Sequence, residues 1–272
     1  MTRRRDEMLK EMGLWPRWRQ RELPPSIETA ASESEQPLTA ASDMRTASSA
    51  VRVPPVETDD RRTHIMRMDW PALKACVAEC TACPLHEKRN KTVFGVGDEN
   101  ADWLFVGEGP GADEDAQGEP FVGQAGRLLD NMLAAIGLKR GRNVYIANVV
   151  KCRPPGNRNP APEEALACEP HLQRQIELIR PRLIVALGRV AAVNFLARDA
   201  SIASLRGRLH QYRGIPLLVT YHPAYLLRSL PDKAKAWADL CFAVDAMKDL
   251  KGKSGNEGPE KKNGNEGNST NS

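Results

Sequence analysis

The sequence predicts an α/β fold with three layers, α/β/α, around a central, mainly parallel, four-stranded sheet. Four short apolar runs have the character of strands, and long helical segments separate them. Connections of that length are crossovers, which join parallel strands and cover both faces of the sheet. Glu108, Asn148 and His222 lie at or just past the ends of three of these runs. In such a sheet the ligand lies over the carboxyl ends of the strands.

The predicted elements alternate along the chain. The strands are apolar runs, and they cover 103–107, 144–150, 183–187 and 216–220. The helices are longer, and they cover 125–136, 162–179, 189–197 and 231–248. Gly137 closes the first helix, and Gly188 precedes the third. Pro170 interrupts the second helix, and we expect it to start a separate one because proline has no N–H for a helix interior.

Composition divides the 272 residues into a folded body and flanking segments. One domain of ordinary size is expected at 63–250. Residues 1–23 are basic, with apolar residues near one face, and predict a short helical arm. The segment 24–62 is rich in Ala, Ser, Thr, Glu and Pro, and the segment 251–272 is rich in Gly, Asn, Lys, Glu and Ser. We expect both to be disordered, as a linker and a tail.

The net charge of +4 is small, so any affinity for nucleic acid must come from local basic patches. No segment has the apolar length of a membrane span, and the N-terminus lacks the apolar core of a secretory signal. Asp6, Glu7 and Glu11 also disfavour a mitochondrial presequence. We therefore expect a soluble cytoplasmic protein without a membrane partner, whose cysteines serve metal or redox chemistry more than disulfides.

Four of the six cysteines suit a metal site. Cys80 and Cys83 form a C-x2-C pair, Cys152 follows the second predicted strand, and Cys168 lies on the next helix. Such a set can hold zinc or a [4Fe–4S] cluster, and the spacing alone does not choose between them. Unligated, partly buried thiols are the alternative. The other two cysteines are expected to face the core from helices; they are Cys76, which is near enough in sequence to be a spare ligand, and Cys241.

Four motifs follow one another through the folded body. They are Gly-Glu-Gly-Pro-Gly at 107–111, Gln-Gly-Glu-Pro-Phe-Val-Gly at 117–123, Asn-Val-Val-Lys-Cys-Arg-Pro-Pro-Gly-Asn-Arg at 148–158 and His-Pro-Ala-Tyr-Leu at 222–226. In these motifs the chain resembles the iron–sulfur (family 4) uracil-DNA glycosylases. The resemblance extends from Cys80 to the final helix and leaves out the arm, the linker and the tail. It implies a doubly wound fold and base excision repair: deoxyuridine is flipped out of DNA, and hydrolysis of its N-glycosidic bond releases uracil and leaves an abasic site.

The same resemblance implies a [4Fe–4S] cluster held by Cys80, Cys83, Cys152 and Cys168. We expect the cluster to be structural, because glycosidic hydrolysis transfers no electron and a site of four thiolates has no open position for catalysis. Its expected effect is to tie the loop after Cys152 to the preceding segment of the chain.

Three residues are expected to act on the flipped base. Phe121 would stack on the pyrimidine. Asn148 would donate to O4 of uracil and accept from N3–H, and it would reject cytosine because buried polar groups would be left mispaired. His222 would donate to O2, a bond that strengthens as negative charge develops on the leaving base.

The attack of water on C1′ of the sugar needs a further group. Other branches of the superfamily carry Asp or Asn in the first loop, where this chain has Gly109, which we place in the substrate pocket. Glu108 and Glu114 are the candidates for a carboxylate that positions water. Glu114 is alternatively a wall against C5 of the ring, which would exclude the methyl group of thymine.

Contacts with single- or double-stranded DNA should come from basic residues beside the pocket. The predicted phosphate contacts are Lys88, Arg89, Lys91, Lys151, Arg153 and Arg158. The residues at 225–228 are predicted to form a wedge that fills the gap left by the extruded base. We expect a monomer whose arm at 1–23 docks a repair or replication partner.

Three other functions compete with this one. A relative that traps DNA covalently on uracil would use a basic loop with a histidine; the segment 205–210 ends in His210, although Gly109 favours hydrolysis. A metal-stabilised nucleic-acid-binding module without catalysis would have no need for Phe121, Asn148 and His222 in one crevice. A nucleotide-binding enzyme is the third, but the glycine loop matches neither the phosphate loop nor Gly-x-Gly-x-x-Gly.

Overall fold

A computed structural model describes residues 56–254 of the chain. By its internal contacts the chain divides at Arg62, and the unit from Thr63 onward holds the sheet. Helix α2 covers Val56–Ile65, so the last residues of the predicted linker are helical. The arm at 1–23 and most of the linker and tail lie outside the described residues. Among the helices that the structure describes, none is both long and apolar enough to cross a membrane.

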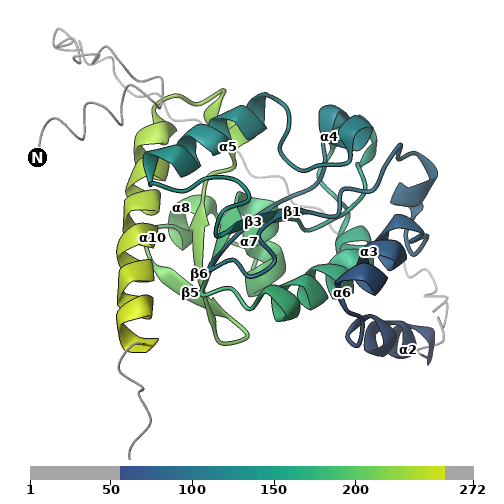
Figure 1. Ribbon diagram of the computed structural model, residues 1–272. Helices are drawn as coiled ribbons and strands as arrows, with labels where there is room; N and C mark the ends of the chain where they lie inside the picture. Colours follow the sequence, from purple (N-terminus) through teal and green to yellow (C-terminus); the bar gives the residue numbers. More distant parts are fainter. Residues whose placement is uncertain (1–55, 255–272) are drawn as a thin grey trace, which may run out of the picture. The chain divides into compact units, whose positions relative to one another are not determined.

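The sheet is mixed and has six strands in the order β1-β3-β2-β4-β6-β5 (Figure 1). Its strands are β1 (Val96–Gly97), β2 (Trp103–Gly107), β3 (Val144–Asn148), β4 (Leu183–Leu187), β5 (Leu209–Tyr212) and β6 (Ile215–Thr220). The four predicted strands form the parallel centre, β3-β2-β4-β6. The two edge strands, β1 and β5, are antiparallel to their neighbours. The α/β prediction is confirmed, but the number of strands was wrong.

Neither edge strand has a strong hydrophobic pattern. Strand β1 has only two residues, and β5 alternates between exposed and half-buried positions, with Leu209 and Gln211 exposed. A tight turn joins β5 to β6, with φ of 49° at Arg213 and 83° at Gly214. Positive φ at both central residues is the geometry that suits a two-residue hairpin. The Arg-Gly pair was therefore the available signal for β5.

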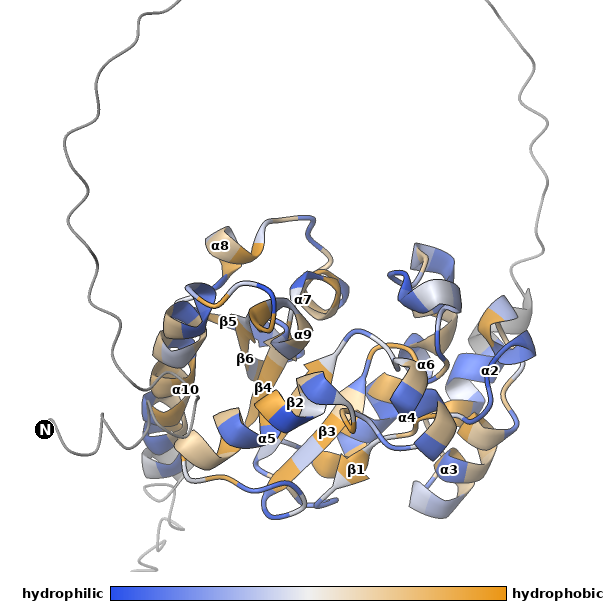
Figure 2. Cartoon of the chain, turned by 90° about the horizontal axis from the view of Figure 1, so that it is seen from above, coloured by the Kyte–Doolittle hydropathy of each residue, from blue (hydrophilic) through white to orange (hydrophobic). Residues whose placement is uncertain are grey.

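Alternation along the central strands produces the three layers. In β2, Leu104 and Val106 pack on one face of the sheet, and Trp103 and Phe105 pack on the other. Helices α6 (Pro162–Ile179) and α7 (Arg189–Leu196) cover the first face, and α5 (Gln124–Ala135) and α10 (Asp232–Ser254) cover the second. Figure 2 shows the apolar strands lying between these helices. The remaining helices are α3 (Trp70–Ala78), α4 (Ala112–Gln117), α8 (Ile202–Leu205) and α9 (Pro223–Leu226), with 3₁₀ turns at Pro84–Glu87 and Pro155–Asn157.

Two helix predictions are corrected by the structure. Pro170 does not start a separate helix, because α6 runs through it without a break. An interior proline costs about 3 kcal/mol, and we attribute the continuity of α6 to Leu172 and Ile176, which pack on the sheet beyond it. The final helix extends to Ser254, past the predicted end at 248 and into the first residues of the predicted tail.

The parallel register places the ends of the central strands together. Gly107 at the end of β2 pairs with Asn148 at the end of β3. The pairing continues past the strands, since Val149 N–H donates to the Gly107 carbonyl and Val150 N–H donates to the Glu108 carbonyl. Strand β6 ends at Thr220, two residues before His222. The loops that follow β2, β3 and β6 therefore meet at one edge of the sheet.

Candidate active site

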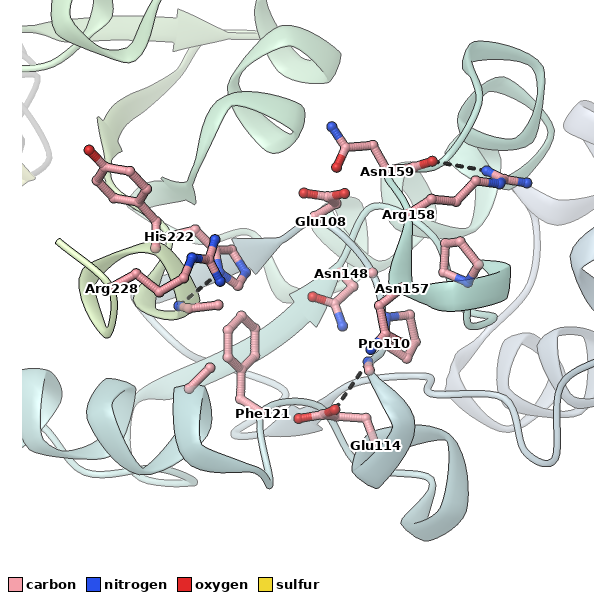
Figure 3. A pocket seen from close by; sticks show the side chains of 16 residues that line it. Glu108, Pro110, Glu114, Phe121, Asn148, Asn157, Arg158, Asn159, His222 and Arg228 are labelled. Carbon is pink, nitrogen blue, oxygen red and sulfur yellow. Dashed lines mark hydrogen bonds between the residues drawn. The ribbon is translucent and has the colours of Figure 1, made fainter.

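A cavity of about 430 Å³ lies at the carboxyl ends of β2, β3 and β6 (Figure 3). All six residues that the sequence predicted for the substrate and the chemistry line this cavity; they are Glu108, Gly109, Glu114, Phe121, Asn148 and His222. Its remaining lining comes mainly from the loop after β3 and from α9. The structure thus brings the three loops of the predicted crevice into one pocket.

Asn148 lies in the middle of this pocket and is almost fully buried, with 2% of its surface exposed. Its side-chain oxygen, Oδ1, has no hydrogen-bond partner among the described residues. A Cβ atom on Gly107 would lie 2.5 Å from this oxygen and 2.5 Å from Cζ of Phe121. Glycine at position 107 is therefore what allows the amide and the aromatic ring to approach β2 so closely. A buried acceptor without a partner indicates a site for a donor on a ligand.

Phe121 is held in a backbone conformation that is unusual for a non-glycine residue. Its φ is 56°, which costs free energy unless the surroundings impose it. Arg140 imposes it from outside the pocket, by donating to the carbonyl oxygens of Pro120 and Phe121, each at 2.8 Å. Gly126 on α5 permits it, because any Cβ there would overlap the Phe121 carbonyl. No motif in the sequence pointed to Arg140 or Gly126.

His222 faces the ring of Phe121 across the pocket, with 5.5 Å between ring centroids and 29° between planes. Its Nδ1 lies 3.2 Å from the backbone N–H of Ala224 and accepts from it. Burial and the nearby charge of Arg228 lower the pKa of His222 to about 4. The ring is therefore neutral near pH 7, and since Nδ1 is an acceptor, Nε2 carries the proton. His222 can thus donate one hydrogen bond into the pocket.

The two predicted carboxylates have different surroundings. Glu108 lines the pocket, and burial raises the pKa of its carboxyl group. The carboxylate of Glu114 accepts from three backbone N–H groups, those of Gly111 (3.0 Å), Val122 (3.0 Å) and Gly123 (3.3 Å). Glu114 therefore ties the glycine loop to the segment that carries Phe121. At Gly109, a Cβ would lie 2.8 Å from a methyl carbon of Val150, so the loop is closely packed there.

A second cavity is lined by Cys80, Cys83, Cys152 and Cys168, the four cysteines of the predicted metal site. No three His, Cys, Asp or Glu side chains in residues 56–254 are placed to share one metal ion. The four cysteines nevertheless line one cavity, and a cluster in which each thiolate binds its own iron needs no single shared metal position. Cys76 is not part of this lining; it lies half-buried on α3, 3.8 Å from Nε2 of His171. Cys241 is half-buried on α10.

Positive charge and N–H donors surround the cysteine cavity. Arg89 donates to Sγ of Cys152 at 3.2 Å, and the backbone N–H of Lys151 donates to Sγ of Cys168 at 3.3 Å. Burial raises the pKa of the Cys168 thiol to about 12, and the charge of Lys151 opposes this shift. A thiolate there needs cations beside it, and both arginine and lysine are in place. The residues present therefore fit an anionic metal–thiolate group.

The predicted phosphate contacts are only partly available. Lys151 is buried, donating to the Asn148 carbonyl and to Gln175, so its prediction as a phosphate contact was wrong. Arg89 also donates to the carbonyls of Ala78 and Cys80, which holds it at the cysteine loop. Arg158 pairs with Glu164 at 2.6 Å. Sequence spacing gave no sign of these internal partners.

The predicted wedge is also divided. Leu226 is 1% exposed and packs with α5 and α10, so it cannot enter DNA. Tyr225 and Leu227 are each 40% exposed beside it. Ser229 and Tyr225 donate to the carboxylate of Asp232, each at 2.7 Å, which fixes the loop that presents them. Of the predicted wedge, only Leu226 is thereby excluded, and Tyr225, Leu227 and Arg228 remain exposed.

His210 lies away from these residues, on the edge strand β5. Its Nε2 is 2.7 Å from the Leu205 carbonyl oxygen, and it is not among the residues that line the pocket. The histidine that the covalent-trapping alternative requires therefore contacts the backbone of its own loop and does not line the pocket.

Comparison with known proteins agrees with this geometry. The model of the uracil DNA glycosylase superfamily matches residues 94–241, more than half of the chain. A type-4 uracil-DNA glycosylase of Archaeoglobus fulgidus is 47% identical over 159 residues, which are 56% of this chain and 79% of that protein. A type-4 uracil-DNA glycosylase of Thermotoga maritima is 50% identical over 155 residues, 56% of this chain and 80% of that protein. A type-5 uracil-DNA glycosylase of Pyrobaculum aerophilum is 34% identical over 146 residues, 48% of this chain and 64% of that protein. This chain therefore belongs to the uracil DNA glycosylase superfamily and, within it, to the type-4 family.

Proposed function

We propose that the chain is a DNA repair glycosylase that hydrolyses the N-glycosidic bond of deoxyuridine in DNA, releasing uracil and leaving an abasic site. One observation carries the proposal furthest: the buried, unpartnered Oδ1 of Asn148 lines the same cavity as the ring of Phe121 and the imidazole of His222. The acceptor of Asn148 and the donor of His222 match polar atoms on the edge of one pyrimidine, and the ring of Phe121 matches its face. The type-4 relatives named above support the same activity.

Recognition of uracil follows from the hydrogen bonds that Asn148 has open. Its Oδ1 accepts from N3–H, and its amide N–H donates to O4. Cytosine presents an acceptor at N3 and a donor at the exocyclic nitrogen, so it would leave buried groups mispaired on both sides, at a cost of about 1–3 kcal/mol each. Phe121 packs against the face of the ring, and the flipped nucleotide fills the pocket in place of water.

The chemical step uses charge stabilisation of the leaving base. As the bond between C1′ and N1 breaks, its electron pair moves onto uracil, and negative charge builds on O2. The Nε2–H of His222 donates to O2, and this bond strengthens in the transition state. A neutral donor suits an anion that leaves unprotonated. Water adds to the positive C1′ and loses a proton to the solvent, which forms the C1′ hydroxyl of the abasic site, and the uracil anion takes up a proton from the solvent.

Glu108 is the carboxylate that we assign to the sugar side of this reaction. It lines the pocket, and in its ionised form it stabilises positive charge at C1′ and orients water. Glu114 accepts three backbone N–H bonds and so has little capacity left for water. We assign it a positioning role: it keeps Phe121 against the base, and the segment it holds limits the space near C5.

We propose a structural [4Fe–4S] cluster held by Cys80, Cys83, Cys152 and Cys168. When bound, it supplies iron–thiolate cross-links between the segment after α3, the loop after β3 and helix α6. The common cavity of these cysteines and the Arg89 donor beside Cys152 support a metal–thiolate site, and the type-4 relatives favour iron in it. The chain's own contribution is to align β3 with the loop that follows it.

The proposed substrate is uracil-containing DNA, single- or double-stranded. Lys88, Lys91 and Arg153 remain the candidates for phosphate contacts, and Tyr225 and Leu227 for filling the gap in the stack. We propose a cytoplasmic monomer. The arm at 1–23, which we propose docks a repair or replication partner, lies outside the described residues.

A single gel experiment tests the activity. The purified protein is incubated with an end-labelled, single-stranded oligonucleotide carrying one uracil, treated with hot alkali, and run on a denaturing gel beside a His222→Ala control. We expect strand cleavage at the uracil with the wild-type protein only. A shifted, alkali-resistant protein–DNA band would indicate covalent trapping, and binding without either product would indicate a non-catalytic module.

A further inference from the structure

Lys151 is a buried lysine between the two cavities of the protein. It is 1% exposed and lines the cysteine cavity. Its Nζ donates to the backbone carbonyl of Asn148 at 2.9 Å and to Oε1 of Gln175 at 2.6 Å. Burying an ammonium group is costly unless it is paired and hydrogen-bonded. Here the buried ammonium group donates to the carbonyl of Asn148, the residue proposed to read the base, which suggests that its role concerns that residue.

The partners of Lys151 are themselves fixed to distant segments. Gln175, fully buried on α6, donates to the Phe94 carbonyl at 2.9 Å. The backbone of Lys151 accepts from Val93 N–H at 2.8 Å and donates to Sγ of Cys168. Lys151 therefore connects the segment before β1, the end of β3 and helix α6. A displacement of any of these would be transmitted to the Asn148 carbonyl.

The orientation of Asn148 depends on this main-chain anchor. Its Oδ1 makes no hydrogen bond within the described part of the chain, so that atom is not held by a bond of its own. The backbone position of residue 148 must then set the direction of the amide. Pairing with Gly107 fixes one side of this peptide, and Lys151 fixes its carbonyl.

Lys151 also faces the thiol groups of the cysteine cavity. A tetrahedral ammonium group has three N–H donors, and the Asn148 carbonyl and Gln175 take two of them. The same side chain therefore lines the cysteine cavity and holds the end of β3.

We infer that Lys151 is a positioning residue for uracil recognition, which holds the end of β3 so that the Asn148 amide meets the base. The inference rests on the proposed function, because Asn148 is the group that reads uracil there. It links the two cavities through one side chain, because Lys151 lines the cysteine cavity and holds the carbonyl of the residue that reads the base.

The test compares Lys151→Met and Gln175→Met, which remove the donor and its anchor, with Gln173→Met. Gln173 is the matched control: it is a buried glutamine on the same helix, and its side chain donates to Glu177 instead of Lys151. Iron content and visible absorbance are measured for each protein. Single-turnover excision at uracil is then measured per iron-loaded chain. Affinity is measured with an oligonucleotide carrying 2′-fluoro-2′-deoxyuridine, whose fluorine opposes positive charge at C1′ and so slows hydrolysis.

With affinity for the same sequence without uracil as the reference, we expect iron-loaded Lys151→Met to bind the fluorinated oligonucleotide more weakly than the wild-type protein does. We also expect it to excise uracil roughly tenfold more slowly or worse. Gln175→Met should share the direction of both effects, and Gln173→Met should share neither. A loaded Lys151→Met with the wild-type rate would overturn the inference. A rate that falls only in proportion to lost iron would do the same, since it would leave Lys151 a purely structural role.

Should Lys151→Met fail to fold, Gln175→Met decides: a loaded, wild-type-like Gln175→Met would contradict the positioning role. Failure of the proposed function gives a different result. In that case the wild-type protein itself would release no uracil while retaining its iron, before any variant is compared.

Discussion

The imidazole of His222 lies over the ring of Phe121, with centroids 5.5 Å apart. The two residues come from different segments of the chain, Phe121 from between α4 and α5 and His222 from the start of α9. The Phe121 ring and the Nε2 donor of His222 therefore have a fixed relation before any DNA binds. Preorganised donors of this kind lower a barrier because they need no rearrangement as charge develops.

Replacing His222 by alanine should lower the single-turnover rate of uracil excision about 100- to 1,000-fold. Because burial and Arg228 hold the pKa of His222 near 4, the ring is neutral at pH 6 and at pH 8. The ratio of wild-type to variant rates should therefore be the same at both pH values. A ratio that grew markedly toward pH 6 would show that the charged ring is the donor.

Replacing Asn148 by alanine should reduce excision about 100-fold or more, since two hydrogen bonds to a buried base are lost. Binding of undamaged DNA should change little, because the residue lies inside the pocket and away from the phosphates. Rates on uracil and affinities for a uracil-free oligonucleotide measure the two effects separately. An equal loss of both would place the defect in folding, which circular dichroism and iron content would reveal.

Glu108 should produce the acidic limb of the pH–rate profile. Burial raises the pKa of this carboxyl above its ordinary value of 4.5. As pH falls through that raised value, the carboxylate takes up a proton, and its stabilisation of C1′ is lost. The rate should therefore decline on the acidic side at a pH above 4.5, and Glu108→Gln should be slower and lack the limb. A variant with the wild-type profile would remove Glu108 from the mechanism.

Gly126→Ala tests the support of Phe121. A methyl group at this position would overlap the carbonyl oxygen of Phe121, so the segment 120–123 must move. Excision should fall by about tenfold or more, and the free energy of unfolding by about 1–3 kcal/mol. Gly137→Ala is a useful comparison: φ there is 77°, so alanine is strained, but no atom lies within 4 Å of the added Cβ. Equal losses of excision in both variants would contradict the role of the Gly126 contact.

Cys168→Ser should abolish the brown colour and lower both iron content and thermal stability, because one of four thiolates and a buried contact with Lys151 N–H are lost. Cys241→Ser is the matched control, since Cys241 lies on α10 outside the cysteine cavity. Iron retained at the wild-type level in Cys168→Ser would contradict the proposed ligand set.

The central part of this fold could be read from the sequence because β2, β3, β4 and β6 are apolar runs buried on both faces. Strand β5 could not, since its polar edge position leaves only the Arg213–Gly214 turn as a signal. The prediction that Pro170 starts a new helix was wrong, because packing of α6 on the sheet outweighs the low preference of proline for a helix interior.

The site shows a similar division. The roles of Asn148 and His222 could be predicted from the sequence, because each is a polar residue at or just after the end of an apolar strand. The roles of Lys151, Arg140 and Gly126 are not, because each depends on contacts with a backbone carbonyl whose direction only the folded chain fixes. A lysine in a basic segment is usually exposed to solvent, and here that general expectation failed.

The segment from Asn148 to Arg158 lines both cavities, the pocket on one side and the cysteine site on the other. This shared wall limits how the enzyme can diversify. Lengthening or shortening it to admit a larger base would also displace Cys152. New base preferences are therefore more accessible through the opposite walls, the loop after β2 and the start of α9, where side chains can change while the cysteine site stays intact.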